Sequence, residues 1–238
     1  MVRYSQNFLV NEKIADFIVE SAQIKEDDIV LEIGPGRGIL TKRLVNRAKV
    51  IAIEIDENLC AYLSSIFSSQ IQEARLQIIC EDALKVEFPK FTKLVANIPY
   101  HISSPLLFKI LSYDFNEAIV LLQEEFAERL CASSGSKKYG RLSVMMYYNG
   151  SAKILTKVRR GNFSPAPKVD SAIVHIKKEP RFCYDPEVLS NVVRKIFQHR
   201  RKKIKNILGE VPFGERRAEE LTPEEICEVA KHVHRLSD

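Results

Sequence analysis

The stretch LVANIPYHISSP, residues 94–105, ends an apolar run in an amide, a proline and an aromatic side chain. This group suits an exocyclic amino group on a flat base, whose nitrogen lone pair is delocalised into the ring. Two acceptors that each take one N–H would localise that pair, and the candidates are the side-chain oxygen of Asn97 and the carbonyl of Ile98. Pro99 biases Ile98 toward an extended conformation. The Tyr100 ring offers a stacking surface for a base flipped out of its helix.

The same residues have a purely structural alternative, in which Asn97 caps the next helix while Pro99 and Tyr100 shape a turn. The chemical interpretation requires no general base, because an amine becomes acidic as it is alkylated and its proton can leave to water. His101 is accordingly predicted to be a helix-entry residue rather than a base.

A second candidate is the glycine loop LEIGPGRG, residues 31–38, which follows an apolar run and opens a helix. Gly34, Gly36 and Gly38 would let the backbone turn sharply and approach a ligand closely. A dinucleotide fingerprint needs a glycine three residues after the second one, and the chain has Ile39 there. A Walker lysine pattern is also missing. By itself the loop is equally consistent with a tight turn between strand and helix.

Acidic residues end the next two apolar runs. Glu54 follows the loop by roughly 20 residues, where an acid accepts hydrogen bonds from a ribose diol. Asp82, in CEDA, would accept the amino group of adenine, although alone it is also a common kind of helix cap. Glu32, beside the loop, would repel phosphates but tolerate a positively charged ligand. These acids favour S-adenosylmethionine as the ligand over NAD.

Short apolar runs alternate with helix-period segments through most of the chain. Near-continuous Val/Ile runs indicate strands buried on both faces, which predicts a doubly wound α/β fold with a mostly parallel sheet and helices on both sides. The last two runs would form an antiparallel pair that finishes this sheet. The expected strands are residues 29–33, 50–55, 76–80, 93–97, 118–123, 152–158 and 171–177.

After Pro180 the pattern changes to helix-period segments alone. They cover residues 186–208 and 222–235, and Thr222 is the expected N-cap of the second helix. We therefore predict two domains, residues 1–180 with the sheet and residues 181–238 as a small all-helical domain.

Positive charge is concentrated in two stretches of this chain of net charge +5. Residues 194–205 carry seven Lys/Arg and no acid, and residues 153–178 carry seven against one Asp. Such clusters are typical of polyanion binding, although a basic solvated face is the alternative. In the first stretch a helix would present several charges on one side. The candidate RNA-binding residues are Arg194, Lys195, Arg200, Arg201, Lys202, Lys203 and Lys205.

The five cysteines are scattered and contain no CxxC pair, so we expect buried thiols and neither a disulfide framework nor a structural metal site. No apolar stretch approaches the roughly 20 residues that span a bilayer. The N-terminus lacks the apolar run of a signal peptide. The expected location is the cytoplasm, with no membrane partner.

Seven motifs, in order along the chain, resemble those of the KsgA/Dim-type rRNA adenine N6,N6-dimethyltransferases. Ile98, where bacterial relatives usually have Leu, and the short length are more similar to an archaeal member. The resemblance implies a class I (Rossmann-like) methyltransferase domain, S-adenosylmethionine as donor and two adjacent adenosines near the 3′ end of small-subunit rRNA as acceptors. The motifs are SQNFLVN (5–11), EIGPGRGILT (32–41), EID (54–56), EDAL (81–84), NIPYHISSP (97–105), FSPAPKVDSA (163–172) and FQHRRKKIKNIL (197–208).

The resemblance also implies roles for individual residues. Asn97, Ile98, Pro99 and Tyr100 match the catalytic tetrapeptide, and Phe163 matches an aromatic that clamps the target base opposite Tyr100. The residues that match the donor site, including its methionine end, its loop, its ribose acid and its adenine acid, are Gln6, Asn7, Leu9, Gly34, Gly36, Gly38, Glu54, Ile55, Asp82, Ala83 and Asn97.

Two alternatives stay open at this point. The Erm-type large-subunit rRNA methyltransferases share nearly all of these motifs, although the FSPAPKVDSA stretch and the RRK-rich segment favour the small-subunit branch. A degenerate methyltransferase fold that serves as a non-catalytic assembly factor is the other alternative, which the intact tetrapeptide disfavours. The expected partner is small-subunit rRNA within an immature subunit, bound by a monomeric enzyme.

Overall fold

The computed structural model describes residues 7–183 and 185–235, which form two compact units. The first unit comprises the chain up to Ala127 together with Lys153–Lys178, and the second comprises Glu128–Ala152 together with the chain from Glu179 onward. The boundary predicted near residue 180 therefore lies close to one of the points at which the chain passes from one unit to the other. The structure assigns residues 128–152, which that division left in the first domain, to the second unit.

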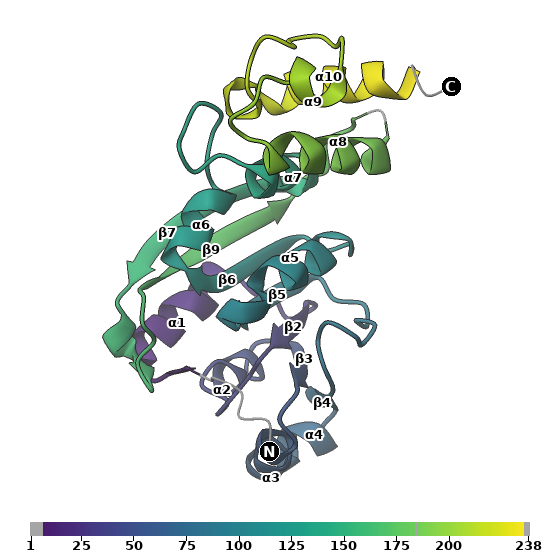
Figure 1. Ribbon diagram of the computed structural model, residues 1–238. Helices are drawn as coiled ribbons and strands as arrows, with labels where there is room; N and C mark the ends of the chain where they lie inside the picture. The colour runs from purple at the N-terminus through teal and green to yellow at the C-terminus, as the bar shows by residue number, and fades with distance from the viewer. Residues whose placement is uncertain (1–6, 184, 236–238) are drawn as a thin grey trace. The chain divides into compact units, whose positions relative to one another are not determined.

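Seven strands of the described residues form one sheet, and their bounds agree closely with the expected apolar runs (Figure 1). Its first five strands are mutually parallel, while β9 runs antiparallel to β6, so the last two strands finish the sheet as predicted. In spatial order the strands are β4 (Leu76–Cys80), β3 (Lys49–Glu54), β2 (Ile29–Ile33), β5 (Lys93–Asn97), β6 (Glu117–Gln123), β9 (Ser171–Lys178) and β7 (Gly150–Val158).

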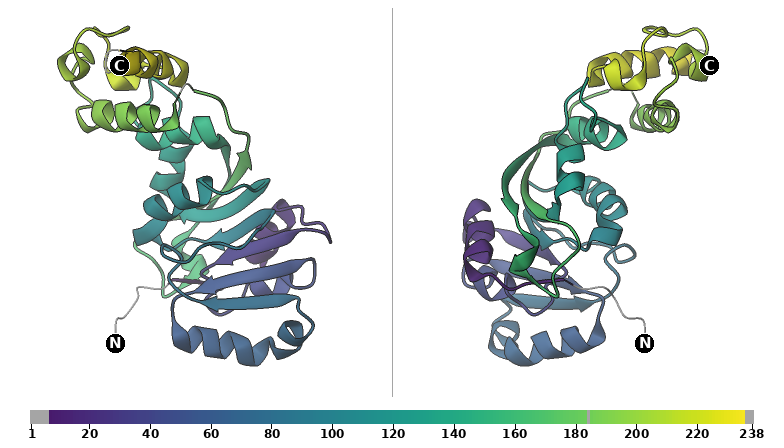
Figure 2. Two further views of the ribbon diagram at one scale, coloured as in Figure 1. Left: turned by 90° about the vertical axis from the view of Figure 1, so that its right-hand side faces the viewer. Right: turned by 60° about the vertical axis from the view of Figure 1, so that its left-hand side comes forward.

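Helices cover both faces of this sheet, with α1 on one side and α5 on the other (Figure 2). The α/β fold class is thereby confirmed. No helix of the described residues is long and apolar enough to cross a membrane. The helices that accompany the sheet are α1 (Glu12–Ser21), α2 (Thr41–Leu44), α3 (Glu57–Ile66), α4 (Ser68–Gln72), α5 (Ser103–Leu111), α6 (Glu124–Leu130) and the short 3₁₀ helices η1 (Tyr100–Ile102) and η2 (Arg160–Asn162).

A two-stranded ribbon lies beside the main sheet. Strand β1 (Phe8–Leu9) pairs antiparallel with β8 (Phe163–Ser164), and the Val10 N–H donates to the Asn162 carbonyl at 2.9 Å. The ribbon ties the start of the described chain to the hairpin between β7 and β9.

The second unit has its own core, formed by the facing sides of three helices. They are α7 (Arg141–Asn149), α8 (Pro186–Gln198) and α10 (Pro223–Arg235). Thr222 caps α10 as predicted, since its hydroxyl accepts the Glu225 N–H at 3.3 Å while the Glu225 carboxylate accepts the Thr222 N–H at 2.8 Å.

The single helix expected over residues 186–208 is wrong. Helix α8 ends at Gln198, because His199 leaves the helical conformation at φ −119° and ψ 42°. The chain then turns, and only the short α9 (Lys205–Leu208) follows. Ile204 explains the turn, because its side chain is fully buried in the core and its N–H donates to the Arg216 carbonyl at 2.9 Å.

The expectation of free thiols is also wrong for four cysteines. Disulfide bonds join Cys60 to Cys80 in the first unit and Cys183 to Cys227 in the second. The partners lie 20 and 44 residues apart in the sequence. Their pairing depends on the return of α3 along β4 and of α10 beside the start of α8, which spacing alone does not reveal.

Candidate active site

A cavity of about 400 Å³ opens at the carboxyl ends of β2, β3, β4 and β5. In parallel α/β sheets, ligands bind at this edge. The connections that follow two neighbouring central strands leave in opposite directions, and this opens a crevice between them. Most of the predicted donor and acceptor residues meet there. The lining includes Asn7, Phe8, Gly34, Gly36, Glu54, Ile55, Glu81, Asp82, Ala83, Asn97, Ile98, Pro99, Tyr100 and His101.

The glycine loop forms one wall of the cavity, and its backbone conformation disfavours side chains at Gly34 and Gly36. Gly36 has φ +58°, and a Cβ added there would lie 2.8 Å from the Phe8 ring. Gly34 has φ +69°, and a Cβ added there would lie 3.5 Å from the Asn97 carbonyl oxygen. Both positions favour glycine. The loop therefore provides a narrow backbone cradle at the sheet edge, which fits the close approach of a nucleoside-bearing ligand.

Glu54 is fixed at the end of β3 by backbone donors. Its carboxylate accepts the N–H groups of Gly36 at 3.1 Å, Ile55 at 3.0 Å and Asp56 at 3.1 Å. Burial raises the pKa of this carboxyl, and the three N–H groups oppose that shift. Ile55 follows as a partly exposed apolar side chain in the cavity lining. An acid with an adjacent apolar face suits a ribose next to an adenine ring.

Asp82 holds the turn after β4 and faces the same cavity. One of its oxygens accepts the Leu84 N–H at 2.9 Å, which stabilises the turn at residues 83–85 and caps no helix. The loop is held from behind by Lys109 of α5, whose ammonium donates to the Ala83 carbonyl at 3.0 Å and to the Val86 carbonyl. Ala83 is buried in the lining, so the loop presents an acid and a small apolar surface together.

Asn97 is the last residue of β5, and no donor among the described residues binds its side-chain oxygen. Its amide nitrogen donates to the Asn7 carbonyl at 3.3 Å, which leaves the oxygen as the acceptor. Ile98 is fully buried, and its N–H donates to the Leu121 carbonyl of β6 at 3.1 Å. No hydrogen bond reaches the Ile98 carbonyl from residues 7–183 or 185–235. The two acceptors predicted from the sequence are therefore both without a competing donor in this part of the chain.

Three predicted site residues lie elsewhere. Leu9 and Phe163 are each 4% exposed and belong to the hydrophobic core, outside the cavity lining. A Cβ at Gly38 would lie 2.9 Å from the Phe67 ring, so this glycine serves helix packing. Gln6 lies outside the described residues. The base-clamping role of Phe163 stays a prediction.

The sequence analysis missed Phe8, which covers the glycine loop. Successive residues of a strand face opposite sides, so a buried Leu9 in β1 places its neighbour toward the cavity. The Arg37 guanidinium lies 5.0 Å from the centre of the Phe8 ring. The alternation of side chains along SQNFLVN was the signal that could have found Phe8.

Glu32 does not present a charge to the cavity, which corrects the role expected for it. Its side chain is 1% exposed and accepts the Thr41 hydroxyl at 2.8 Å, while its other oxygen has no partner among the described residues. Burial, with a smaller contribution from the neighbouring charge of Glu54, raises the pKa of Glu32 to about 8 against the opposing effect of the Thr41 hydrogen bonds. The acid is therefore mainly neutral at pH 7.

The family of the chain follows from comparison with known proteins. Residues 2–232 match the family model described as ribosomal RNA adenine dimethylase. The chain belongs to this family. Its relatives include the probable ribosomal RNA small subunit methyltransferases A of Pyrococcus furiosus, 42% identical over 97% of this chain and 91% of that one, and of Methanosarcina acetivorans, 41% identical over 98% and 93%. The predicted archaeal likeness is confirmed.

Two solved structures are similar to this dimethylase over nearly its whole length. A dimethyladenosine transferase from Plasmodium falciparum is 30% identical, with a TM-score of 0.85 over 97% of this chain and 98% of that one. The 23S rRNA methyltransferase ErmE is 27% identical, with a TM-score of 0.76 over 96% and 100%. The class I methyltransferase fold is thereby confirmed. The cofactor of this dimethylase is S-adenosylmethionine, as predicted, and its substrate is ribosomal RNA.

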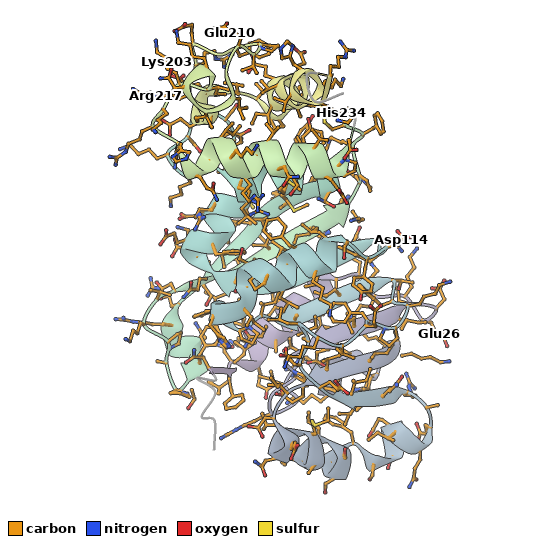
Figure 3. The ribbon with its side chains drawn as sticks, turned by 45° about the vertical axis from the view of Figure 1, so that its right-hand side comes forward. Glu26, Asp114, Lys203, Glu210, Arg217 and His234 are labelled. Carbon is orange, nitrogen blue, oxygen red and sulfur yellow. A yellow bond between two sulfur atoms is a disulfide. The ribbon has the colours of Figure 1, made fainter. Side chains whose placement is uncertain are left out.

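The basic run of the dimethylase does not form one charged helix face. Arg194 and Lys195 lie on α8, Arg200 to Lys203 in the turn, and Lys205 on α9. Lys203 and Arg217 lie side by side through an isolated bridge (Figure 3).

Three of these charges are paired with acids of the same unit. Arg200 binds Glu219, and Glu215 binds both Lys203 and Lys205, which lower the pKa of Glu215 to about 2. Arg201 and Lys202 are exposed and make no ion pair with any residue that the structure describes. Pairing with acids of the same unit therefore accounts for part of the run.

Replacing Glu54 by glutamine should weaken S-adenosylmethionine binding by about 1–3 kcal/mol, because donor hydroxyls would lose a charged acceptor. Isothermal titration calorimetry measures this directly. Glu57→Gln is the matched control, since Glu57 is an exposed acid in the first turn of α3 and lies outside the cavity lining. Equal affinities of the two variants would remove Glu54 from the donor site.

Proposed function

We propose that this dimethylase transfers methyl groups from S-adenosylmethionine to N6 of two adjacent adenosines near the 3′ end of small-subunit rRNA. The observation that carries the proposal is the pair of acceptors at the end of β5. Asn97 and Ile98 line the cavity that also contains Glu54 and Asp82, and the Asn97 oxygen is available there. A site with acceptors at one end and ribose and adenine acids at the other can hold an amino group against a nucleoside-bound methyl donor.

Different residues of the chain have different roles in this reaction. When bound, S-adenosylmethionine supplies an electrophilic methyl group. Glu54 and Asp82 hold the donor end of the cavity, and the Gly34 and Gly36 backbone lets the ligand approach closely. Asn97 and Ile98 accept the two N–H groups of the target amine and localise the nitrogen lone pair toward the methyl group. These acceptors act mainly in the transition state, as the nitrogen rehybridises.

The tyrosine of the tetrapeptide would hold the base itself. Tyr100 lines the cavity together with Asn97 and is half-buried, and its ring would provide the surface on which the adenine stacks. Stacking of a base on an aromatic ring contributes on the order of 1–3 kcal/mol. Proton loss from the methylated nitrogen needs no fixed base, and His101, which is exposed at the cavity rim, is not assigned that role.

The choice of small-subunit rRNA rests on the names of the relatives at about 40% identity, whereas the ErmE likeness is more distant. We place the reaction in the cytoplasm, on an immature small subunit, with a monomeric enzyme. The helical unit would dock the RNA through phosphate contacts, and the exposed charges of its basic turn are the first candidates.

Incubating the enzyme with labelled donor and either small-subunit or large-subunit RNA, followed by mass spectrometry of RNA fragments, tests the proposal. We expect dimethyladenosine at two adjacent positions of small-subunit RNA. Label in large-subunit RNA alone would favour the Erm-type activity. Donor binding without label in either RNA would favour a non-catalytic assembly factor.

Neutralising Arg201 and Lys202 together should weaken RNA binding and flatten its salt dependence. Each phosphate that the protein no longer neutralises lowers the log-log slope by roughly 0.7–0.9. RNA affinity measured across a salt series, with donor affinity as a check on folding, gives the slopes. We expect donor affinity to stay unchanged.

The matched control is the double variant Arg200→Gln and Lys203→Gln. It removes the same number of charges, but from residues already paired with Glu219 and Glu215. Its slope should change less than that of the Arg201 and Lys202 variant. If the salt dependence of RNA affinity has the same log-log slope in the Arg201 and Lys202 variant as in wild type, the basic turn is not a docking surface.

A further inference from the structure

Ser171 is a fully buried polar residue at the start of β9, and its hydroxyl lies 2.6 Å from the hydroxyl of Tyr100. A buried hydroxyl is costly unless it is hydrogen-bonded. Tyr100 is its only side-chain partner among residues 7–183 and 185–235. The two residues are 71 positions apart in the sequence, so the fold brings together the NIPY tetrapeptide and the end of the FSPAPKVDSA stretch.

The backbone around Ser171 is held from two sides. Ser171 pairs with Gln123 of β6 in the antiparallel register, and the preceding Asp170 carbonyl accepts the Glu124 N–H at 3.0 Å. The Asp170 carboxylate accepts the Arg160 N–H at 2.8 Å, which fixes the base of the hairpin. The Ser171 hydroxyl is therefore presented from a rigid position.

The backbone of Tyr100 is also held. It begins the short η1 helix, in which the Pro99 carbonyl accepts the Ile102 N–H at 3.2 Å and the Ser103 hydroxyl at 3.2 Å. A tyrosine side chain has two rotatable bonds between its backbone and its ring. The hydroxyl oxygen lies on the axis of the second rotation, so fixing the backbone at one end and the hydroxyl at the other restricts the first rotation and sets the position of the ring before any base arrives.

We propose that Ser171 is a positioning residue for methyl transfer, which acts through the Tyr100 hydroxyl to hold the ring at the position where the target adenine stacks. This inference rests on the proposed function of the cavity. It assigns a reason for a serine at this point of the FSPAPKVDSA stretch, where a bulkier side chain has no space and an apolar one leaves the Tyr100 hydroxyl without its partner.

The test is a double-mutant cycle of Ser171→Ala and Tyr100→Phe in the full chain, with turnover at saturating donor and RNA as the main readout. Each single variant should lower kcat by roughly fivefold to tenfold, the effect of one hydrogen bond that orients a reacting group. The double variant should be no slower than Tyr100→Phe, because Ser171 has no further role once the hydroxyl is gone. Donor affinity by calorimetry should stay unchanged in all three.

Ser143→Ala is the matched control. Ser143 is also buried, and its hydroxyl donates to the Arg129 carbonyl at 2.6 Å, but it lies outside the cavity lining. This variant should lose stability without losing turnover at a temperature where it is folded. It separates the cost of removing a buried hydrogen bond from a displacement of the Tyr100 ring.

Several outcomes would overturn the inference. One is wild-type turnover in Ser171→Ala, and another is an equal further loss when Ser171→Ala is added to Tyr100→Phe. If Ser171→Ala does not fold, Tyr100→Phe alone tests the proposal, because it removes the same hydrogen bond at a half-buried residue. Wild-type turnover of Tyr100→Phe would then contradict the proposal. A wild-type enzyme that methylates no RNA would overturn the proposed function with it, whereas an active wild type confines the failure to Ser171.

Discussion

Replacing Asn97 by alanine should lower methyl transfer at saturating donor and RNA by about 10²–10³-fold, the scale seen when one preorganised hydrogen-bonding group is removed from a transition state. The structure explains why the loss should fall on kcat. The Asn97 amide nitrogen is engaged by the Asn7 carbonyl at 3.3 Å, so the side chain is held with its oxygen available for the target amine. Such an acceptor matters most as the nitrogen lone pair localises.

Single-turnover kinetics with labelled donor measure this effect, and calorimetry measures donor affinity in parallel. Donor affinity should change far less than turnover, because Glu54 and Asp82 hold the other end of the cavity. Asn116→Ala is the control, since Asn116 is an exposed asparagine outside the lining. Near-normal turnover of the Asn97 variant would contradict the mechanism.

The parallel sheet and its functional edge were predictable because they depend on local patterns. Runs such as IVLEI and KLVAN are largely apolar, and the strands β2 and β5 cover the same residues. Once the strands are parallel, their carboxyl ends share one edge. Glu54, Asp82 and Asn97 each lie at the end of such a run, so their meeting in one cavity followed from the sequence.

The features that sequence reasoning missed depend on contacts between distant segments. The Cys60–Cys80 bond needs the return of α3 along β4, and the hydrogen bond between Tyr100 and Ser171 needs the antiparallel placement of β9 beside β6. The break after Gln198 was hidden because a burial requirement at Ile204 overrode the helical charge pattern. The clamping role of Phe163 rests on resemblance alone and stays a prediction, while its strand β8 pairs with β1 and its side chain lies in the core.

Glu32 should make the protein less stable as pH rises from about 4.5 to about 8. Its pKa is raised to about 8 in the folded state, mainly by burial, from an ordinary value near 4.5. Between these two values the folded chain binds a proton at Glu32 that the unfolded chain has released. The free energy of unfolding therefore falls with pH, and the contribution of the neutral acid is fully present below about pH 4.5 and lost as pH passes about 8.

The variant Glu32→Gln isolates this contribution, because it keeps the shape and an acceptor for the Thr41 hydroxyl but cannot ionise. Urea unfolding of both proteins from pH 5 to pH 9 gives the difference in the free energy of unfolding, in which the titration of all other groups largely cancels. As pH rises, the free energy of unfolding of the variant should increase relative to that of wild type, by on the order of a few kcal/mol in total. The difference should level off above the pKa of Glu32 in the folded state. A difference that stays constant across this range would mean that Glu32 has the same pKa in the folded and unfolded chains, and that the burial of Glu32 in β2 is compensated by contacts other than the Thr41 hydroxyl.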